Sequence, residues 1–480
     1  MTVPLRDTLR ELGEQMPPAR LPEDLWRRGR RQRHRTKIIT AAVAIAAALL
    51  CATVAVAPGL HVEPQPAGGG PVIPRSVELP YLWQATVDMA PPGPATVLFG
   101  GDSWGLGSDP FEEEGGKLAV VGRDGAYRML RYPVHGLRAG QDVRLSPDGS
   151  LVAQSVLTGG PAGWLVVTDL RTGRGRGYGV GPSACCFEVA AWRPDSGAVL
   201  VLHRTGSVVL GGVGQTEGPP AQYVLVDLAG GALVPVDDVF VRDPVVSAWV
   251  AAFAPDGRGF VATRPAAGGG TELRGYDAAG QRRWSRDLGD RRRLAGAGAY
   301  TPDGSAVALL SVDGCADTKE CDHDQLAARR WRVSYVDAAT GADREGPALP
   351  AVTGPAVRAL GWHGDTLVVV QYELEDDIRQ EPDDTGWAET RHVRVLALRP
   401  DGTAGVVLDP PAGVSSIDIA QDLLGDGRFG GPVPAPAALP ARWSVVAQGA
   451  LFLLVPMLLA TAAAVVILRA IRRRRTATRA

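Results

Sequence analysis

The chain has 480 residues, with 60 Gly, 38 Pro, 45% hydrophobic residues and a formal net charge of −2. This hydrophobic content excludes a disordered chain, and the Gly and Pro residues lack the strict period of collagen. The charge is uneven, since residues 1–37 hold ten Lys or Arg against five acids, and six Arg follow Leu468 with no acid. The ends are therefore basic and the middle acidic, and we expect one large, turn-rich all-β domain with accessory segments.

The first 37 residues are predicted to be a basic cytoplasmic leader. Residues 27–37 hold seven Lys or Arg. A basic block of this kind can bind nucleic-acid phosphates, but an apolar segment follows it at once. We therefore expect it to flank a membrane segment, with no nucleic acid as partner. Before it, apolar residues at helical spacing predict a short amphipathic helix: Leu5, Leu9, Leu12 and Met16.

Two charge-free segments, residues 38–57 and 445–468, are predicted to be transmembrane helices. They have 20 and 24 residues, and about 20 helical residues span the hydrocarbon core of a bilayer. A cleaved signal peptide is the alternative for the first segment, because residues 55–57 resemble a cleavage box. The long leader and Pro58, directly after the box, favour an uncleaved anchor instead.

The arginine-rich flanks predict how the chain is oriented in the cell membrane. Positive residues stay on the cytoplasmic side, so both termini, including the basic tail 469–480, are expected inside. The part between the two apolar segments is then extracytoplasmic. It begins with a Pro/Gly-rich tether at residues 58–80 and ends with a linker at residues 431–444.

A five-residue turn recurs through the middle of the chain. In residues 146–150, Ser-Pro-Asp-Gly-Ser, Pro fixes the first corner, the Asp side chain caps the turn and Gly supplies a positive φ. Hydrophobic runs follow most copies, and their spacing suits the blades of a propeller. Related turns lie at residues 193–197, 254–257, 301–304 and, in degenerate form, 362–365.

A second kind of turn, built on Asp and Gly, falls between these copies, for example at residues 169–173 and 337–341. Each unit is therefore predicted to contain a strand, the Pro-Asp-Gly turn, a strand, a longer loop, a strand, the Asp-Gly turn and a strand. Six such units fit between Tyr81 and Asp409.

The ends of this repeat array leave two arrangements open. The first unit is expected to begin with a strand at residues 81–89. Residues 415–422 form either a further strand that closes the ring or a cap helix. We therefore predict an all-β, six- or seven-bladed β-propeller over residues 81–430, flanked by the two transmembrane helices.

This pattern resembles the WD40-like and TolB-type β-propeller repeats, whose blades carry Ser-Pro-Asp-Gly before an inner strand. The resemblance covers about 330 residues. It implies the fold but no function, because propellers host many unrelated functions.

The whole layout is similar to a group of actinobacterial membrane proteins with a basic leader, an anchor and an external propeller. Some of that group resemble regulators of sigma factors, which implies a sigma factor as a cytoplasmic partner. Residues 1–37 lack the His-x3-Cys-x2-Cys zinc motif of anti-sigma factors, which counts against direct sigma binding.

Residues 101–105, Gly-Asp-Ser-Trp-Gly, match the G-x-S-x-G elbow of α/β-hydrolases and the Gly-Asp-Ser opening of SGNH esterases. An elbow needs a helix after the nucleophile, and residues 106–110 cannot begin one that lasts. None of the seven His follows an Asp by three residues, as the SGNH family requires. An esterase that uses Ser103 is therefore a minor alternative, and we predict no catalytic residues and no enzyme.

Cys315 and Cys321 lie outside the membrane in this topology and are predicted to form a local disulfide. The adjacent Asp-His-Asp at residues 322–324 is too small a set for a metal site, so we predict neither a metal nor a cofactor. Cys185 and Cys186 either pair or stay buried as small hydrophobic residues. Cys51 lies in the first apolar segment, as a packing residue or a lipidation site.

Residues 373–384 hold seven acids but lack the Gly at the sixth position of an EF-hand loop. A solvated hairpin tip is the default, with a calcium or cationic-partner site as the alternative. Trp104 and Trp387 are candidate ligand anchors if they are exposed. Three further tryptophans fall at strand positions typical of blade cores: Trp192, Trp331 and Trp362.

A binding or sensing module is the function that these features favour. The propeller would bind an unknown extracytoplasmic protein or ligand, the lipid bilayer would hold the anchors, and the leader would pass a signal to a cytoplasmic protein. The alternative is an envelope scaffold without a signalling role, in which the leader serves only topology.

Overall fold

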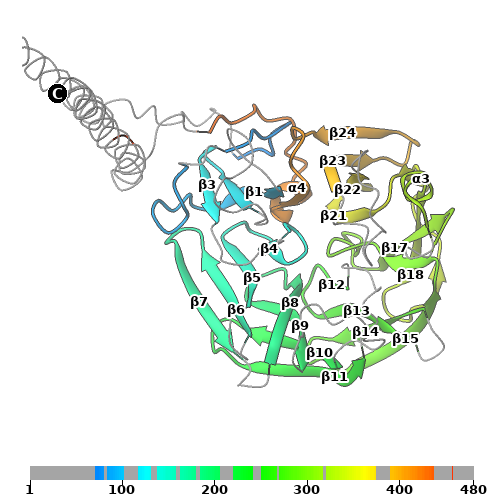
Figure 1. Cartoon of the computed structure of the whole chain (residues 1–480). Coiled ribbons are helices and arrows are strands. Elements are labelled where there is room, and N and C mark those ends of the chain that lie inside the picture. The colour runs from blue at the N-terminus through cyan, green and yellow to red at the C-terminus, as the bar shows by residue number, and fades with distance from the viewer. Residues whose placement is uncertain are drawn as a thin grey trace, which may run out of the picture. The chain divides into compact units, whose positions relative to one another are not determined.

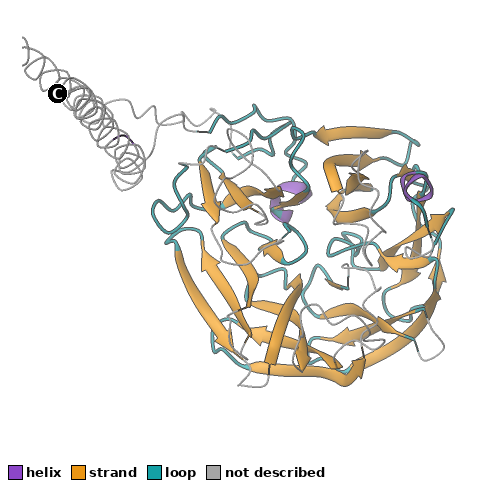
Figure 2. Cartoon of the chain, in the orientation of Figure 1, coloured by secondary structure: helices purple, strands orange, loops and turns teal. Residues whose placement is uncertain are grey.

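The computed structural model describes residues 71–80, 84–101, 117–130, 138–157, 163–179, 184–205, 220–241, 250–266, 270–316, 321–374, 390–436 and 457. Contacts divide the chain into two units, residues 1–62 and 63–480, and every described residue belongs to the second. Its strands form six antiparallel sheets arranged as blades around a common centre (Figure 1). Strands dominate the regular structure, with the short helices α3 (His323–Ala327) and α4 (Gln421–Gly425) between them (Figure 2).

Five blades are formed by strands that follow one another along the chain, from the centre outward. Blade 2 contains β4 (Val143–Leu145), β5 (Leu151–Leu157), β6 (Gly163–Asp169) and β7 (Arg174–Gly179). Blade 3 contains β8 (Ala184–Trp192), β9 (Ala198–Thr205), β10 (Pro220–Asp227) and β11 (Leu233–Val241). Blade 4 contains β12 (Ala251–Phe253), β13 (Gly259–Pro265), β14 (Thr271–Asp277) and β15 (Arg282–Gly289).

The last two consecutive blades follow the same order. Blade 5 contains β16 (Arg292–Leu294), β17 (Ala306–Asp313), β18 (Arg330–Asp337) and β19 (Asp343–Arg344), with β20 (Val352–Thr353) also paired to β18. Blade 6 contains β21 (Val357–His363), β22 (Thr366–Leu374), β23 (Thr390–Leu398) and β24 (Ala404–Leu408). The predicted unit of four strands with two kinds of turn is therefore confirmed.

Blade 1 closes the ring, because it combines strands that lie far apart in the sequence. Its inner strand is β25 (Ser416–Ile419), which pairs antiparallel with β1 (Ala95–Gly101). The outer strands are β2 (Lys117–Gly122) and β3 (Tyr127–Leu130). The described part of the chain thus forms six blades, so the predicted all-β propeller is confirmed and, of the six or seven blades left open by the sequence, the described residues form six.

The first strand predicted for this blade, at residues 81–89, is wrong. From residue 84 to 89 the structure has a single parallel bridge, between Thr86 and Met129 on the outer strand. The inner position is taken by β25 instead. Both alternatives for residues 415–422 are realised, since α4 follows β25 after one residue.

In blade 6 the outer strand is more exposed than the second strand, and the sequences of the two strands differ accordingly. The second strand of blade 6, β22, is mostly buried and reads as an apolar run, Leu367–Val370. The outer strand β24 alternates between exposed and partly buried residues. A strand that is covered on both faces needs consecutive β-branched or large apolar residues, whereas a half-exposed strand alternates.

The hydrophobic core lies between neighbouring blades rather than at one point. One cluster joins blades 1, 2 and 6, and it includes Phe99, Val152 and Val370. Others join blades 4, 5 and 6, blades 3 and 4, and blades 2 and 3. Each sheet is thus stabilised by packing against its two neighbours, as expected when sheets pack face to face.

The aspartates of the repeated turns cap them with their side chains, as predicted. In the turn at residues 146–150, Asp148 Oδ1 accepts hydrogen bonds from the hydroxyl of Ser146 at 2.7 Å and from the backbone N–H of Ser150 at 3.1 Å. Gly149 has a φ of 69°. A Cβ atom at Gly149 would also overlap the backbone carbonyl of Ala95 in blade 1.

The related turn at residues 193–197 differs from the prediction in one respect. Ser196, and not the glycine after it, has the positive φ, at 58°, and no other described non-glycine residue does. The left-handed conformation costs a residue with a Cβ about 1 kcal/mol or more. The Ser196 hydroxyl donates to Asp148 Oδ1 at 3.0 Å, so this strained turn ties blade 3 to blade 2.

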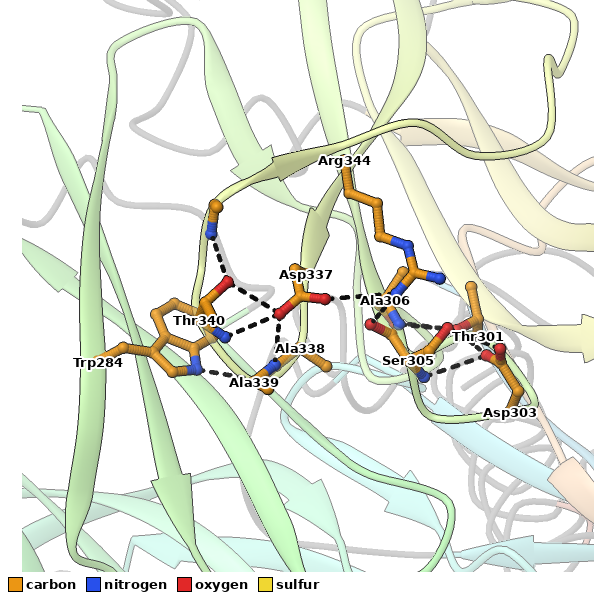
Figure 3. A network of polar contacts seen from close by, with 11 residues as sticks. Trp284, Thr301, Asp303, Ser305, Ala306, Asp337, Ala338, Ala339, Thr340 and Arg344 are labelled. Atoms are coloured by element: carbon orange, nitrogen blue, oxygen red, sulfur yellow. Dashed lines mark hydrogen bonds and ion pairs between the residues drawn. The ribbon is translucent and has the colours of Figure 1, made fainter.

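Blade 5 shows the two kinds of turn side by side (Figure 3). Asp303 accepts hydrogen bonds from the hydroxyls of Ser305 and Thr301, each at 2.6 Å, and from the backbone N–H of Ser305. These bonds stabilise the charged carboxylate. They lower the pKa of Asp303 to about 2.

The second turn of blade 5 connects to the first turn and to blade 4 (Figure 3). Asp337 accepts a hydrogen bond from the Thr340 hydroxyl at 2.8 Å. Arg344 donates to the backbone carbonyl of Ser305 at 2.8 Å, which joins the two turns. Trp284 of blade 4 donates its indole N–H to the carbonyl of Ala338 at 2.9 Å, so the turn also holds two blades together.

The predicted tether and linker contribute in part to the folded unit. Ile73 and Val77 are buried, although we expected residues 58–80 to be an extended spacer. The backbones of the two segments are hydrogen-bonded, since the Gly431 N–H donates to the Ile73 carbonyl at 2.9 Å.

The segments predicted to span the membrane, 38–57 and 445–468, lie outside the described residues apart from Met457. Within the residues that the structure describes, no helix combines the length and hydropathy needed to cross a bilayer. The leader 1–37 and the tail 469–480 are also outside the described residues. The two membrane helices therefore stay a prediction.

Gly149→Ala should destabilise the chain more than Gly304→Ala. Both glycines have a φ of 69°, so each alanine suffers the same backbone strain of about 1 to 2 kcal/mol. A Cβ at Gly304 meets only Pro255 Cδ at 3.6 Å, whereas at Gly149 it overlaps Ala95. We expect a further loss of about 1 to 3 kcal/mol for Gly149→Ala, measured by urea unfolding. Equal losses would contradict the close packing of this turn on blade 1.

Asp303→Asn should lower stability in a pH-dependent way. The pKa of Asp303 is about 2 when folded, against an ordinary 3.8, so its stabilising effect is complete above about pH 4 and disappears as the pH falls towards 2. The urea midpoints of wild type and variant should therefore differ at neutral pH and converge over that range.

Asp256→Asn is the matched control for this measurement. Asp256 occupies the same position in its turn, but Ala254 and Arg258 stand in place of Thr301 and Ser305, whose hydroxyls bind Asp303. Among the described residues, its carboxylate accepts a hydrogen bond from the backbone N–H of Arg258 and lies 4.0 Å from the Arg258 guanidinium. Its substitution should cost less. A difference in urea midpoint between wild type and Asp303→Asn that does not change with pH would contradict the low pKa given to Asp303.

Candidate functional site

The inner strands of the blades meet around the centre of the propeller (Figure 1). Several of these strands contain charged residues. Apart from β16, these strands are mostly apolar, and a buried charged residue within one must find a partner or face a cavity. The charged residues on them include Arg144, Glu188, Arg293, Arg358 and Asp418.

A small pocket lies among these strands. Its cavity volume is about 20 Å³, which is room for roughly one water molecule. The lining comes from blades 1, 2, 3 and 6, from the segment after β16 and from the first residue of α4. It consists of Arg144, Leu145, Trp192, Ala297, Arg358, Leu360, Asp418, Ile419 and Gln421.

Asp418 links three blades at one side of the pocket. Its Oδ1 accepts a hydrogen bond from Arg358 Nη1 of blade 6 at 3.3 Å, and its Oδ2 accepts the backbone N–H of Leu145 of blade 2 at 3.0 Å. Arg358 is 1% exposed and also donates to the hydroxyl of Tyr372 at 3.4 Å and to the carbonyl of Ile417. Both oxygens of Asp418 are therefore used.

Arg358 is well compensated in this position. Burial by itself would lower its pKa, because it disfavours the charged form. The charges and hydrogen bonds of Tyr372 and Asp418 outweigh burial, and the pKa of Arg358 is raised. Arg358 therefore stays positively charged and pairs with β25, the strand that closes the ring.

Arg144 is less well compensated, although it is 3% exposed. Its Nε donates to the carbonyl of Val189 in blade 3 at 2.8 Å. Among the described residues its two terminal nitrogens have no hydrogen-bond partner. Burial, followed by repulsion from Arg358, lowers the pKa of Arg144 to about 10, against weaker attraction from Asp418, Tyr372 and Asp142.

Two further acids lie near the pocket but do not line it. Asp142 accepts the backbone N–H of Arg138 at 3.1 Å. Its pKa is raised, first by burial and then by repulsion from Glu188. The pocket lining itself has two guanidinium groups and one carboxylate, so it has an excess of one positive charge.

The cysteines predicted to pair are joined in the structure by a disulfide, Cys315–Cys321, with the Cα atoms 5.8 Å apart. Leu326 and Leu374 pack against it. Arg329 donates from Nε to the carbonyl of Cys315 at 2.7 Å and from Nη2 to the Cys321 sulfur at 3.3 Å. The disulfide therefore lies in the connection between β17 and β18 of blade 5, where it meets β22 of blade 6, and it does not line the central pocket.

The residues considered for metal binding have other contacts. Asp322 caps α3 by accepting the backbone N–H of Gln325 at 2.8 Å, and His323 lies 3.7 Å from Asp324. Glu373, the first of the acid-rich residues, pairs with Arg394 at 2.5 Å. In the described ranges, no group of three or more potential ligands is placed to hold a metal ion.

Other candidate residues fall outside what the structure describes. Ser103, Trp104 and Trp387 lie there, as do Cys51 and the acid-rich residues 375–384. Cys185 and Cys186 lie on β8, and their side chains are not described. The three predicted core tryptophans are buried in blades 3, 5 and 6: Trp192, Trp331 and Trp362.

Sequence reasoning missed the residues of the central pocket. Arg144 and Asp418 each stand alone in a strand of three or four residues, between apolar neighbours, in the sequences Val-Arg-Leu and Ile-Asp-Ile. The sequence signal for this site is a charged residue in the middle of a short apolar strand. In the case of Arg144, the strand lies directly before a Pro-Asp-Gly turn. This signal indicates a side chain directed to the propeller centre.

No family model and no curated protein matches the chain. Similar solved structures include a putative TolB from Agrobacterium tumefaciens, 16% identical, which covers 67% of this chain and 91% of that chain with a TM-score of 0.36. An oligogalacturonate lyase in complex with manganese is 14% identical over 69% and 78%, with a TM-score of 0.38. An acylaminoacyl peptidase from Pyrococcus horikoshii is 11% identical over 61% and 41%, with a TM-score of 0.33. These similarities concern the fold alone.

The prediction that the chain is not an enzyme is corrected by this comparison. Structures similar to the chain include enzymes, namely the lyase, the acylaminoacyl peptidase and prolyl endopeptidases. The reason is physical, because a propeller fixes the arrangement of strands and leaves the chemistry to its loops and centre. The fold therefore does not separate a binding module from an enzyme.

Asp418→Asn should destabilise the chain strongly. The change removes the negative charge beside Arg358, which is almost fully buried, and breaking a buried ion pair in this way costs about 3 to 5 kcal/mol. Asp343→Asn is the control, because Asp343 also binds arginines, Arg286 and Arg292, but its side chain is 61% exposed. Its loss should be about 1 kcal/mol or less. Similar unfolding midpoints for the two variants would contradict the role given to Asp418.

Proposed function

We propose that the chain is a binding or sensing module whose propeller is held on the extracytoplasmic side of the cell membrane. The central pocket is the observation that carries the binding part of this proposal. Buried charged residues from several blades line it, and the terminal nitrogens of one of them, Arg144, have no hydrogen-bond partner among the described residues. Buried charge is weak evidence for stability, because desolvation opposes it. A ligand that contacts this charge is a sufficient reason for its presence.

The location outside the membrane is supported by the sequence and by the disulfide. The charge-free segments 38–57 and 445–468 have the length of bilayer-spanning helices, and basic clusters flank each one. Disulfides persist in oxidising compartments and are rare in the cytosol. The Cys315–Cys321 disulfide lies in the propeller. An orientation with both termini in the cytoplasm places the propeller, and with it this disulfide, in the oxidising compartment.

The signalling part of the proposal concerns the leader. Residues 1–37 are longer than a topological signal requires and include the amphipathic pattern of Leu5, Leu9 and Leu12. In this proposal the leader binds a cytoplasmic regulatory protein, such as a sigma factor, when the propeller has bound its ligand or partner protein. The lipid bilayer is the third partner, through the two anchors.

Protease applied to intact cells should digest the propeller and spare the leader. The test uses the full chain with one epitope tag at the N-terminus and antibodies against the propeller. The propeller signal should fall severalfold while a short tagged fragment survives, because the bilayer protects only the cytoplasmic part. A propeller that is digested only after lysis would overturn the proposed location.

Permeabilised cells are the control, since both signals should then disappear. Alkylation of the same samples reports the disulfide, because Cys315 and Cys321 should react with maleimide only after reduction. A variant without residues 2–20 tests signalling separately. It should keep the topology and change the transcript profile, and an unchanged profile would contradict the signalling part.

A further inference from the structure

We infer that the central pocket binds a carboxylate group, and that the guanidinium of Arg144 is its main ligand contact. This inference deepens the proposed binding function by giving the chemical class of the ligand. It is carried by a buried arginine that lines a cavity and whose terminal nitrogens have no partner within the part of the chain that the structure describes.

The first step is the hydrogen bonding of Arg144. A guanidinium has five N–H donors, and buried polar groups nearly always have partners. Arg144 is 3% exposed, and its Nε bond to Val189 ties blade 2 to blade 3. A structural role thus accounts for Nε. It does not account for the two terminal nitrogens, which have no hydrogen-bond partner among the described residues.

The second step is that the nearby carboxylate is not available to Arg144. Asp418 uses Oδ1 for Arg358 and Oδ2 for the backbone of Leu145, at 3.3 and 3.0 Å. Turning towards Arg144 would break the contacts that hold β25 in the ring. Attraction from Asp418 and Asp142 reaches Arg144 only at longer range. Neither acid therefore accepts a hydrogen bond from the terminal nitrogens of Arg144 in the described structure, and an external anion would supply that partner.

The third step concerns the shape and charge of the ligand. The cavity volume of about 20 Å³ is roughly that of one water molecule, so only the oxygen end of a terminal group enters the pocket and the rest of the ligand lies outside it. A carboxylate is planar, and it matches the fork of a guanidinium with two parallel hydrogen bonds. Its single negative charge equals the excess positive charge of the lining. A phosphate is larger and carries more charge, so it fits both properties less well.

Gln421 is placed to assist in the same pocket. Its amide can donate a hydrogen bond, and no such bond to another described residue uses this group. Gln421 begins α4, directly after the strand that contains Asp418. The pocket thus offers the guanidinium of Arg144 and one neutral amide to an incoming carboxylate.

The test compares an acid with its neutral analogue on the full-length chain. N-acetyl-alanine and N-acetyl-alaninamide have the same shape, but only the first has a carboxylate. Apparent Kd values follow from the rise of Tm with ligand concentration, at constant ionic strength set with sodium chloride. The acid should bind at least tenfold more tightly than the amide. Equal binding, or no binding of the acid, would overturn the inference.

Variants then locate the binding. Arg144→Gln should weaken the acid at least tenfold, and Arg144→Lys should give an intermediate value because it keeps the charge and loses the fork. Arg258→Gln is the control, since that side chain is 88% exposed on a blade turn, and it should leave the Kd unchanged. An unchanged Kd in Arg144→Gln would overturn the inference. If that variant does not fold, Arg144→Lys and the acid-to-amide ratio of the wild type decide.

Two further ligands separate the sources of the carboxylate. Acetate that binds as tightly as N-acetyl-alanine would indicate a small free acid, and N-acetyl-alanine that binds tenfold more tightly would indicate the end of a peptide chain. Inorganic phosphate that binds more tightly than either would overturn the carboxylate class. Failure of these tests leaves the protease result on membrane location unaffected, so the two proposals can fail separately.

Discussion

The pairing of β25 with β1 is the constraint on which the propeller depends. Five blades are made from consecutive strands, but blade 1 exists only when Ser416–Ile419 reach the edge of Ala95–Gly101. Backbone hydrogen bonds make this joint, and Asp418 reinforces it by bonding at once to Arg358 of blade 6 and to the backbone of blade 2. One carboxylate therefore connects both sides of the closing strand. The hydrophobic cluster shared by blades 1, 2 and 6 forms around it.

The same geometry concentrates charge at the centre. Inner strands converge, so charged residues on several of them are brought close to one another, in surroundings where an unpaired charge is costly. Asp418 and Arg358 satisfy one another. Arg144 has a bond to the neighbouring blade, and its terminal nitrogens have no hydrogen-bond partner in the described ranges. Structural and binding roles thus meet in one pocket, because the residues that join the blades are also those that line its cavity.

Much of the fold could be predicted from local sequence. The Asp caps in turns such as those at Asp148 and Asp303, followed by hydrophobic runs, correctly predicted the four-stranded units, since a turn is decided by a few adjacent residues. A ring-closing strand at residues 415–422 was one of the two predicted alternatives, but its place as the inner strand of blade 1 could not be predicted, because Ser-Ile-Asp-Ile has no local sign of its partner in residues 95–101. The glycine rule also placed the positive φ at Gly197, whereas a bond to Asp148 holds Ser196 there.

The candidate site was missed for the same reason. A lone Arg or Asp in a strand looks like a surface charge until the ring brings Arg144 and Asp418 together with Arg358. Their proximity depends on contacts between residues far apart in the chain.

The order of the strands has a consequence for biogenesis. During synthesis β1 emerges about 320 residues before its partner β25, so the nascent chain carries an unpaired edge strand for most of its translation. Such an edge is a template for pairing with another copy. If two chains exchange their terminal strands, each ring closes with the other's β25 and an intertwined dimer results. Assembly of the monomer therefore depends on cotranslational protection of that edge, or on closure that is faster than the encounter of two nascent chains.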